Sequence, residues 1–157
     1  MPQTHTYSAQ LSWTGAAKGP AKSYASFSRE HVVAFEGKPT LTVSADPHYK
    51  GDPAILNPEE LQLAALASCH MLTYLSWTAR KGVVVTAYED RPEGKVNVEG
   101  GVGQFAEVTL HPRVTIAKGS DLALAQKLHD DAHRDCFIAR SVNFPVHHAP
   151  EIVQESA

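Results

Sequence analysis

One long apolar helix dominates the sequence. Asn57 is a good N-cap, Pro58 suits the first helical position because its missing N–H costs nothing there, and Glu60 stands where a capping box places it. Lys81-Gly82 is typical of a helix end. Between these signals, apolar side chains cover nearly the whole circumference: Leu61, Leu63, Ala64, Ala65, Leu66, Ala67, Met71, Leu72, Leu75 and Trp77. A helix of this kind has to be covered on most sides, so we expect it to be the buried central element of the fold.

The sequence before this helix predicts a meander of short strands. Residues 7–13 alternate apolar and polar side chains, and residues 23–27, 31–35 and 41–43 repeat the strand pattern. A glycine-proline turn and a loop over residues 46–53 interrupt this series of predicted strands.

A second β-rich part follows the helix. Residues 83–88, 95–98 and 104–117 are predicted strands, with turns at residues 92–94 and at Gly100-Gly101. Ser120 is the predicted cap of a second helix that runs to about Arg134, and a short helix from about Cys136 and a strand over 144–148 complete the chain. This order predicts an α+β fold, with antiparallel β-meanders around the long helix, because α/β proteins need regular βαβ alternation.

Length and composition predict one domain, residues 1–157, large enough to bury its own core. The net charge is −3 and the fourteen basic residues are scattered, so we expect no nucleic-acid partner. The apolar stretch over residues 61–77 is interrupted by polar side chains, and the N-terminus lacks the pattern of a leader, so we expect no membrane partner and a cytoplasmic protein. Thiols stay reduced in that compartment unless chemistry oxidises them.

The chain contains two cysteines. Cys69 lies in the middle of the apolar helix, and Cys136 follows the second predicted helix. Free cysteines are commonly small buried hydrophobes. Two thiols on helices that could pack together indicate instead a reactive dithiol and thiol redox chemistry.

Four segments together resemble the OsmC/Ohr family of thiol-dependent peroxidases. Asn57-Pro58-Glu59-Glu60-Leu61 runs into Ala64-Ala65-Leu66-Ala67-Ser68-Cys69-His70-Met71, and a second motif is Cys136-Phe137-Ile138-Ala139-Arg140-Ser141-Val142. Ser28-Arg29-Glu30-His31 and Gln104-Phe105-Ala106-Glu107-Val108-Thr109-Leu110 agree as well. The resemblance covers nearly the whole chain and implies an OsmC-like fold in an intertwined homodimer.

The resemblance also implies roles for four residues. Cys69 would be the peroxidatic cysteine, whose thiolate attacks a peroxide to give a sulfenic acid, and Cys136 the resolving cysteine that condenses with it as a disulfide. Arg29 would stabilise the thiolate and Glu59 would orient that arginine. An external thiol or dithiol would reduce the disulfide, and no flavin, haem or metal is implied. In the organic-hydroperoxide branch Pro follows the second cysteine, whereas Phe137 follows it here.

Helix geometry adds a constraint on this set. Glu59 and Cys69 are ten residues apart on one helix, which is about 15 Å of rise and roughly 80° out of phase. The two side chains therefore cannot serve one site within one chain. If both serve the same chemistry, a second subunit has to bring them together, as in the family's dimer.

Three alternatives stay open. Glu59 could be a first-turn carboxylate that complements the helix dipole. His129, His133 and Cys136 are spaced i, i+4, i+7, and a histidine among His70, His147 and His148 could add a fourth metal ligand. Against metal binding, the chain has no C-x-x-C motif and the histidine pair lacks the zincin glutamate, so we expect His129 and His133 to be solvated or capping residues. The third alternative is a module that binds a small hydrophobic ligand, with unreactive cysteines.

Overall fold

The computed structural model describes residues 1–156. The chain divides into two compact units, Met1–Leu61 and Gln62–Ala157. The long predicted helix is α1, Pro58–Lys81, which begins in the first unit and continues through the second. The two units are described in turn.

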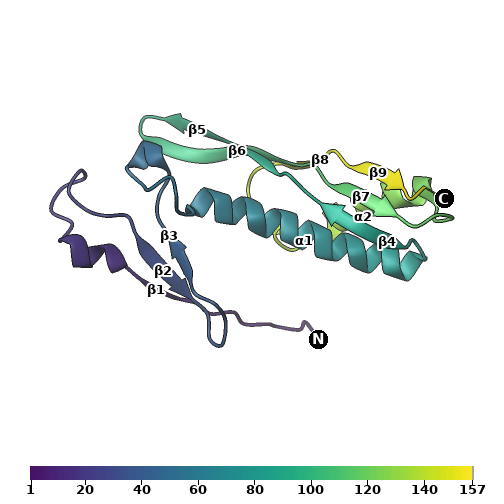
Figure 1. Ribbon diagram of the computed structural model, residues 1–157, viewed down its shortest axis with the longest axis horizontal. Helices are drawn as coiled ribbons and strands as arrows, with labels where there is room; N and C mark the ends of the chain where they lie inside the picture. The colour runs from purple at the N-terminus through teal and green to yellow at the C-terminus, as the bar shows by residue number, and fades with distance from the viewer. Residues whose placement is uncertain (157) are drawn as a thin grey trace. The chain divides into compact units, whose positions relative to one another are not determined.

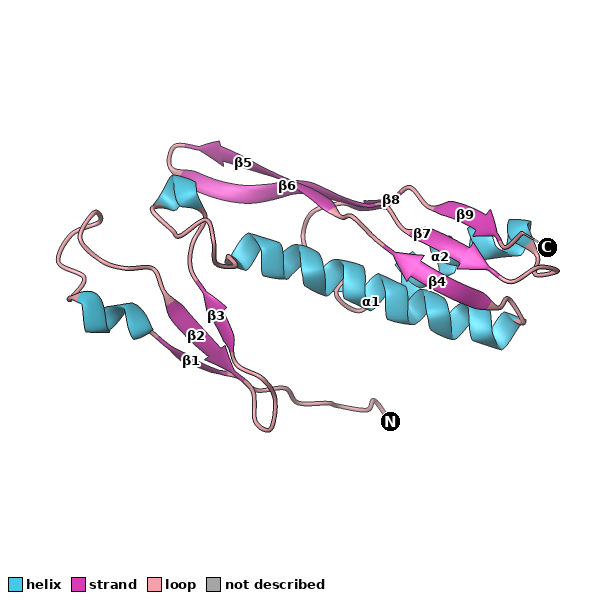
Figure 2. Cartoon of the chain, viewed as in Figure 1, coloured by secondary structure: helices cyan, strands magenta, loops and turns pink. Residues whose placement is uncertain are grey.

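The first unit contains a three-stranded antiparallel meander, drawn in Figures 1 and 2. Strands β1 (Gln10–Ser12), β2 (His31–Ala34) and β3 (Leu41–Val43) pair in chain order, with β2 in the centre. Two short 3-10 helices, η1 (Thr14–Lys18) and η2 (Pro47–Tyr49), lie in the connections. The predicted meander is therefore confirmed over these three strands.

The predicted strand over residues 23–27 is wrong. The Ser26 hydroxyl bonds the backbone of Ser23 and closes a turn. The guanidinium of Arg29 donates hydrogen bonds to the carbonyl oxygens of Tyr24 and Phe27. Because these carbonyls accept hydrogen bonds from a side chain, they do not form the ladder hydrogen bonds of a strand.

The start of α1 is held beside the meander. Val43 forms a parallel bridge with Leu56, and the Ser44 N–H donates to the Leu56 carbonyl at 2.7 Å. Gly51 makes the intervening loop possible, since a Cβ there would stand 1.6 Å from the Ala45 carbonyl oxygen. Only glycine tolerates so close an approach of two backbone segments.

The capping box predicted for α1 is confirmed. The Glu60 N–H donates to Asn57 Oδ1 at 2.9 Å, and the Asn57 N–H donates to Glu60 Oε2 at 3.1 Å. The helix ends at Lys81 and is followed by Gly82 with φ 75°, a left-handed conformation that glycine adopts readily.

The expectation that α1 is buried on most sides holds for one stripe only. The buried residues of the helix recur every four positions: Leu66, His70, Tyr74 and Thr78. On the far side, Leu72 is 59% exposed. One chain therefore leaves an apolar part of its long helix uncovered.

The second unit has two three-stranded sheets. One has the order β4 (Val85–Glu89), β7 (Arg113–Ile116), β9 (Glu151–Gln154), and the other has the order β5 (Glu93–Glu99), β6 (Val102–Leu110), β8 (Val146–His148). β5 and β6 form a hairpin whose turn, Gly100-Gly101, has φ of 59° and 82°. This turn confirms the predicted hairpin, because both residues need the left-handed region.

The strand order of this unit is not the predicted meander. β4 pairs with β7, and the pairs β6–β8 and β7–β9 are parallel. Parallel strands need a crossover connection, and the helix α2, Leu122–Asp135, supplies it between β7 and β8. β9 was not predicted, because its four residues carry little strand pattern of their own.

Two apolar clusters form the core of the second unit. One joins α1, α2 and the β4–β7–β9 sheet around Tyr74, Val114 and Leu128, and the other joins α1 to the β5–β6–β8 sheet around Leu66 and Val108. The N-cap of α2 is Asp121, whose carboxylate accepts from the Leu124 N–H at 2.9 Å. The predicted cap, Ser120, instead accepts a hydrogen bond from the Val84 N–H, just before β4. The predicted α+β class is confirmed.

Candidate functional site

Cys69 lies in an open groove on α1. It is half-buried, and the groove, about 290 Å³ in volume, is lined by Cys69, Leu72, Thr73, Ser76, Trp77, Arg80, Asp135 and Phe137. All of these residues come from α1 or from the segment around the end of α2. The groove therefore exposes one thiol to small molecules from solution.

Cys136 stands next to Cys69 at the end of α2. It is the C-cap of that helix, in an extended conformation, and it is 1% exposed. The Ala139 N–H donates to Cys136 Sγ at 3.5 Å. The pKa of Cys136 is raised to about 11, first by burial and then by a hydrogen bond with the Cys69 side chain. The two thiols are thus direct neighbours, and both are free.

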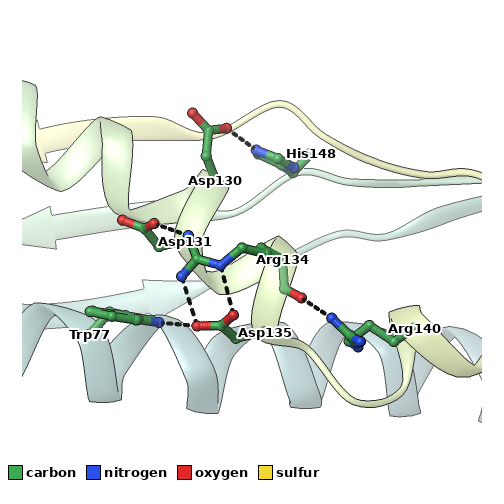
Figure 3. A network of polar contacts seen from close by, with 7 residues as sticks. All are labelled: Trp77, Asp130, Asp131, Arg134, Asp135, Arg140 and His148. Carbon is green, nitrogen blue, oxygen red and sulfur yellow. Dashed lines mark hydrogen bonds and ion pairs between the residues drawn. The ribbon is translucent and has the colours of Figure 1, made fainter.

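A polar network ties the end of α2 to α1 (Figure 3). The Trp77 indole N–H donates a hydrogen bond to the Asp135 carboxylate at 3.0 Å. Arg134 donates two more to the same carboxylate, from Nε at 2.8 Å and from a terminal nitrogen at 2.9 Å. The Arg134 guanidinium also donates to the Asp131 carboxylate at 2.6 Å. Arg140 donates to the backbone carbonyl oxygen of Arg134 at 3.3 Å. Arg134 lowers the pKa of Asp135 and keeps it ionised. Because Cys136 follows Asp135 directly, this network fixes the Cys136 thiol beside Cys69.

The sequence analysis did not predict this polar network around Arg134 and Asp135. The i, i+3 spacing of Asp131 and Arg134 was a readable signal for an ion pair on one helix. No sequence pattern pairs Trp77 with Asp135, because the two are 58 residues apart.

Arg29 and Glu59 belong to the first unit. The Arg29 guanidinium stacks over the Phe27 ring at 3.7 Å, donates to the Phe27 carbonyl at 2.6 Å and also bonds the Tyr24 carbonyl. It lines a pocket of about 310 Å³ together with Pro58, the first residue of α1. Glu59 is half-buried in the first turn of α1, and no ion pair joins it to Arg29 in residues 1–156.

The structure therefore brings together the two cysteines, and it places the other two predicted residues in a different unit. Since α1 is a single unbroken helix, Glu59 and Cys69 stay about 15 Å apart along its axis. The separation between Glu59 and Cys69 that the sequence predicted is therefore present in the structure.

Four histidines lie close together on α1, α2 and β8, and two of them, His70 and His129, are buried. His70 Nε2 and His129 Nδ1 are 3.0 Å apart, His129 stacks on the Tyr74 ring with centroids 3.8 Å apart, and His148 lies beside both histidines. His133 in turn lies 5.3 Å from His148, centroid to centroid. The pKa of His70 is lowered to about 4 and that of His129 to about 3, in both cases mainly by burial.

The expectation that His129 is a solvated or capping residue is wrong. It is 0% exposed, because its position on α2 faces the buried stripe of α1 that contains His70 and Tyr74. One ring nitrogen of each buried histidine is engaged by the other. Across the described residues, no group of three or more histidine, cysteine or acidic side chains is placed to hold a metal ion.

Comparison with known proteins gives the family. Residues 51–151 match the family of OsmC-like proteins. A Bacillus subtilis relative, described as the uncharacterized protein YmaD, is 30% identical over 109 residues, which are 68% of this chain and 73% of the relative. The chain belongs to the OsmC family.

Solved structures agree with this OsmC membership. An OsmC-like protein of unknown function from Vibrio cholerae is 32% identical, with a TM-score of 0.84 over 94% of this chain and 100% of that chain. An organic hydroperoxide resistance protein from Elizabethkingia anophelis aligns with a TM-score of 0.70 over 99% of this chain and all of its own, at 17% identity. The second likeness shows a shared OsmC fold and no more. Over the described residues of this OsmC protein, none of the helices has the length and apolar character needed to cross a membrane.

Proposed function

We propose that this protein is a cysteine-based peroxidase that reduces organic hydroperoxides, hydrogen peroxide or both. The observation that carries the proposal is the pair of neighbouring free thiols, one open to a groove and one buried. Membership of a family that includes organic hydroperoxide resistance proteins supports it. An accessible thiol with a second thiol beside it has the arrangement of a redox cysteine and its resolving partner.

The proposed cycle has three balanced steps. The Cys69 thiolate attacks one peroxide oxygen, so that an S–O bond forms, the O–O bond breaks, and the departing alkoxide takes a proton to leave as an alcohol. Cys136 then attacks the sulfenic sulfur, the S–S bond forms, and hydroxide leaves with the proton from Cys136 as water. An external dithiol finally reduces the disulfide by exchange and becomes a disulfide itself.

In the proposed active form, two chains share each site. The first unit of one chain would bring Arg29 and Glu59 to Cys69 of its partner, in an intertwined homodimer. Two facts support this arrangement: the 15 Å separation along α1, and the exposed apolar side of that helix, which includes Leu72. A planar guanidinium held by a carboxylate would stabilise the thiolate and bind the departing oxygen.

The deciding experiment combines thiol counting with turnover. Reduced protein receives one equivalent of hydrogen peroxide or tert-butyl hydroperoxide, and free thiols are counted against time in a stopped-flow instrument. Loss of two thiols per peroxide, followed by steady turnover with a lipoyl dithiol or with thioredoxin, is the expected result. Unreactive thiols would favour a ligand-binding module, and stoichiometric metal in the purified protein would favour the metal-binding alternative.

A further inference from the structure

A histidine shares the pocket of Arg29 in the first unit. His31 is the first residue of β2, the central strand of the meander drawn in Figure 2, and it is half-buried. The side chains of Arg29 and His31 both line the pocket of about 310 Å³ that Pro58 also lines. His31 therefore occupies the same small space as the guanidinium that is proposed to bind the departing oxygen.

One nitrogen of the His31 ring is engaged and the other is free. Nδ1 lies 2.8 Å from the backbone carbonyl oxygen of Arg29. A carbonyl oxygen only accepts hydrogen bonds, so Nδ1 carries a proton in this contact and the lone pair of the neutral ring is on Nε2. Within residues 1–156, no hydrogen bond or ion pair engages Nε2. This nitrogen is thus available to take up a proton and to donate it to a bound molecule.

The other polar groups of the pocket are engaged elsewhere or are poor proton donors. The Trp13 indole N–H donates to the Ser28 carbonyl oxygen at 2.8 Å. The Ser44 hydroxyl oxygen accepts from the Asp52 N–H at 3.1 Å, and an aliphatic hydroxyl retains its proton at neutral pH. A guanidinium also stays protonated. Among the described lining residues, His31 is therefore the side chain that exchanges a proton readily near neutral pH.

Reduction of an alkyl hydroperoxide requires a proton at the departing oxygen. When the Cys69 thiolate attacks, the S–O bond forms, and the electron pair of the broken O–O bond stays on the departing oxygen as an alkoxide. Arg29 would stabilise this charge, but a guanidinium does not give up a proton to neutralise it. The proton of Cys136 leaves only in the second step, with the water formed there. The first step therefore needs a separate proton donor.

We propose that His31 is the general acid of the first step and that its Nε2–H protonates the departing alkoxide. This inference rests on the proposed peroxidase function and on the sharing of each site, in which the pocket of one chain faces Cys69 of the other. The imidazolium gives its Nε2 proton to the alkoxide, the alcohol leaves, and the neutral ring regains a proton from solvent. A general acid in such a position accelerates its step by about a hundredfold or more.

The test varies the leaving group of the peroxide and follows the oxidation of Cys69 by stopped-flow. tert-Butyl hydroperoxide releases an alkoxide, which needs a proton, whereas peracetic acid, freed of hydrogen peroxide, releases acetate, a weak base that needs none. His31→Gln should lower the rate constant for tert-butyl hydroperoxide about a hundredfold and leave that for peracetic acid close to the wild-type value. Arg29→Ala should lower both, because both reactions use the thiolate.

His31→Asn separates acid catalysis from the positioning of Arg29. The amide nitrogen of asparagine stands where Nδ1 of histidine does, so this variant retains a donor for the Arg29 carbonyl and lacks Nε2. It should lose as much activity toward tert-butyl hydroperoxide as His31→Gln does. His48→Gln changes an exposed histidine of the same unit that does not line the pocket, and it should react as the wild type does with both peroxides.

Two results would overturn the role of His31: equal losses with the two peroxides in His31→Gln, or a wild-type rate constant for tert-butyl hydroperoxide in His31→Asn. Failure of the proposed function gives a different result. Cys69 of the wild type would then react with neither peroxide faster than free cysteine does, and the role of His31 would fall with that function.

Discussion

Cys136 and Phe137 are consecutive residues in opposite environments. The thiol is 1% exposed and the ring is 78% exposed, because the chain turns sharply after α2 and the Arg140 N–H closes that turn on the Cys136 carbonyl at 3.1 Å. Burial raises the pKa of Cys136 to about 11 and keeps its thiol protonated at neutral pH. In the proposed cycle, this protonated state suits a group that acts second, after oxidation of Cys69.

The two cysteines should therefore respond differently to substitution. Cys69→Ser should abolish peroxide consumption. Cys136→Ser should consume about one equivalent and then stall as a sulfenic or over-oxidised species, because no thiol remains to resolve it. Intact-protein mass spectrometry after one equivalent of peroxide reads the difference. An oxygen adduct in Cys69→Ser and none in Cys136→Ser would reverse the roles.

Arg29 offers a second prediction at the residue scale. Its guanidinium bonds two carbonyls and stacks on Phe27, and an ammonium cannot reproduce this planar arrangement. Arg29→Lys should be nearly as harmful as Arg29→Ala, each lowering kcat/KM for peroxide about tenfold or more, which is about 1.4 kcal/mol. Exposed Arg91→Lys is the matched control.

Alkylation of Cys69 as a function of pH tests the reason for that loss. If Arg29 stabilises the thiolate, the midpoint pH of alkylation rises in both Arg29 variants and stays in place in the control. An unmoved midpoint in Arg29→Ala would remove Arg29 from the site.

Among the elements, the contact between α1 and α2 is the one that holds the thiol pair together. Its apolar part is the cluster around Tyr74 and Leu128, and its polar part includes the hydrogen bond between His70 and His129 and the one from Trp77 to Asp135. Both rings are neutral when buried, because burial lowers the pKa of His70 to about 4 and that of His129 to about 3. The contact should therefore be sensitive to acid.

The sign of this effect follows from the pKa values. In the unfolded chain both histidines have an ordinary pKa near 6.5, so the unfolded state binds more protons once the pH falls below that value. The free energy of unfolding should be nearly constant above pH 7 and fall between about pH 6.5 and 4, by up to about 1.4 kcal/mol per pH unit for each group. His148 and His133 act on the pair, and Asp130 bonds His148, so these three groups modulate the slope.

Urea unfolding at a series of pH values measures that slope. His70→Gln with His129→Gln should give a flatter profile between pH 6.5 and 4, even though it is less stable at pH 7. His5→Gln, in the exposed N-terminal segment, is the control. An equally steep profile in the double variant would show that the acid sensitivity comes from other groups.

For the whole molecule, the proposed sharing of sites between chains makes a quantitative prediction. Cys69→Ala and Glu59→Ala are unfolded together and refolded, so that about half of the dimers are mixed. Each mixed dimer has one complete site, in which Glu59 of the first variant meets Cys69 of the second, so about a quarter of wild-type activity should return. Turnover of a hydroperoxide with excess dithiol gives the measurement.

Cys69→Ala mixed with Cys136→Ala is the matched control, because both thiols of a site come from one chain. No mixed dimer of this pair has a complete site, and activity should stay at the sum of the separate variants. The shared-site proposal is contradicted if the first mixture also recovers nothing beyond that sum while native mass spectrometry detects heterodimers.

Local signals in the sequence determined α1, its capping box, the Gly100-Gly101 turn and the α+β class. Each depends on side chains a few residues apart, which act before any tertiary contact forms. The resemblance carried by the motifs at Cys69 and Cys136 pointed to the family on the same local grounds. The predicted strand over residues 23–27 does not form, because Arg29, a few residues further along, donates hydrogen bonds to carbonyl oxygens of this segment.

Tertiary structure alone decided the rest, because the remaining features depend on pairs far apart in the chain. The hydrogen bond that buries His129 against His70 spans 59 residues, and the one from Trp77 to Asp135 spans 58. The parallel pairs of β8 and β9 depend on where α2 returns the chain. A short-range pattern contains no information on such pairs, since their partners are selected by packing and by the need to satisfy buried polar groups. The contact between the two thiols arises in the same way, from the docking of one helix end against another.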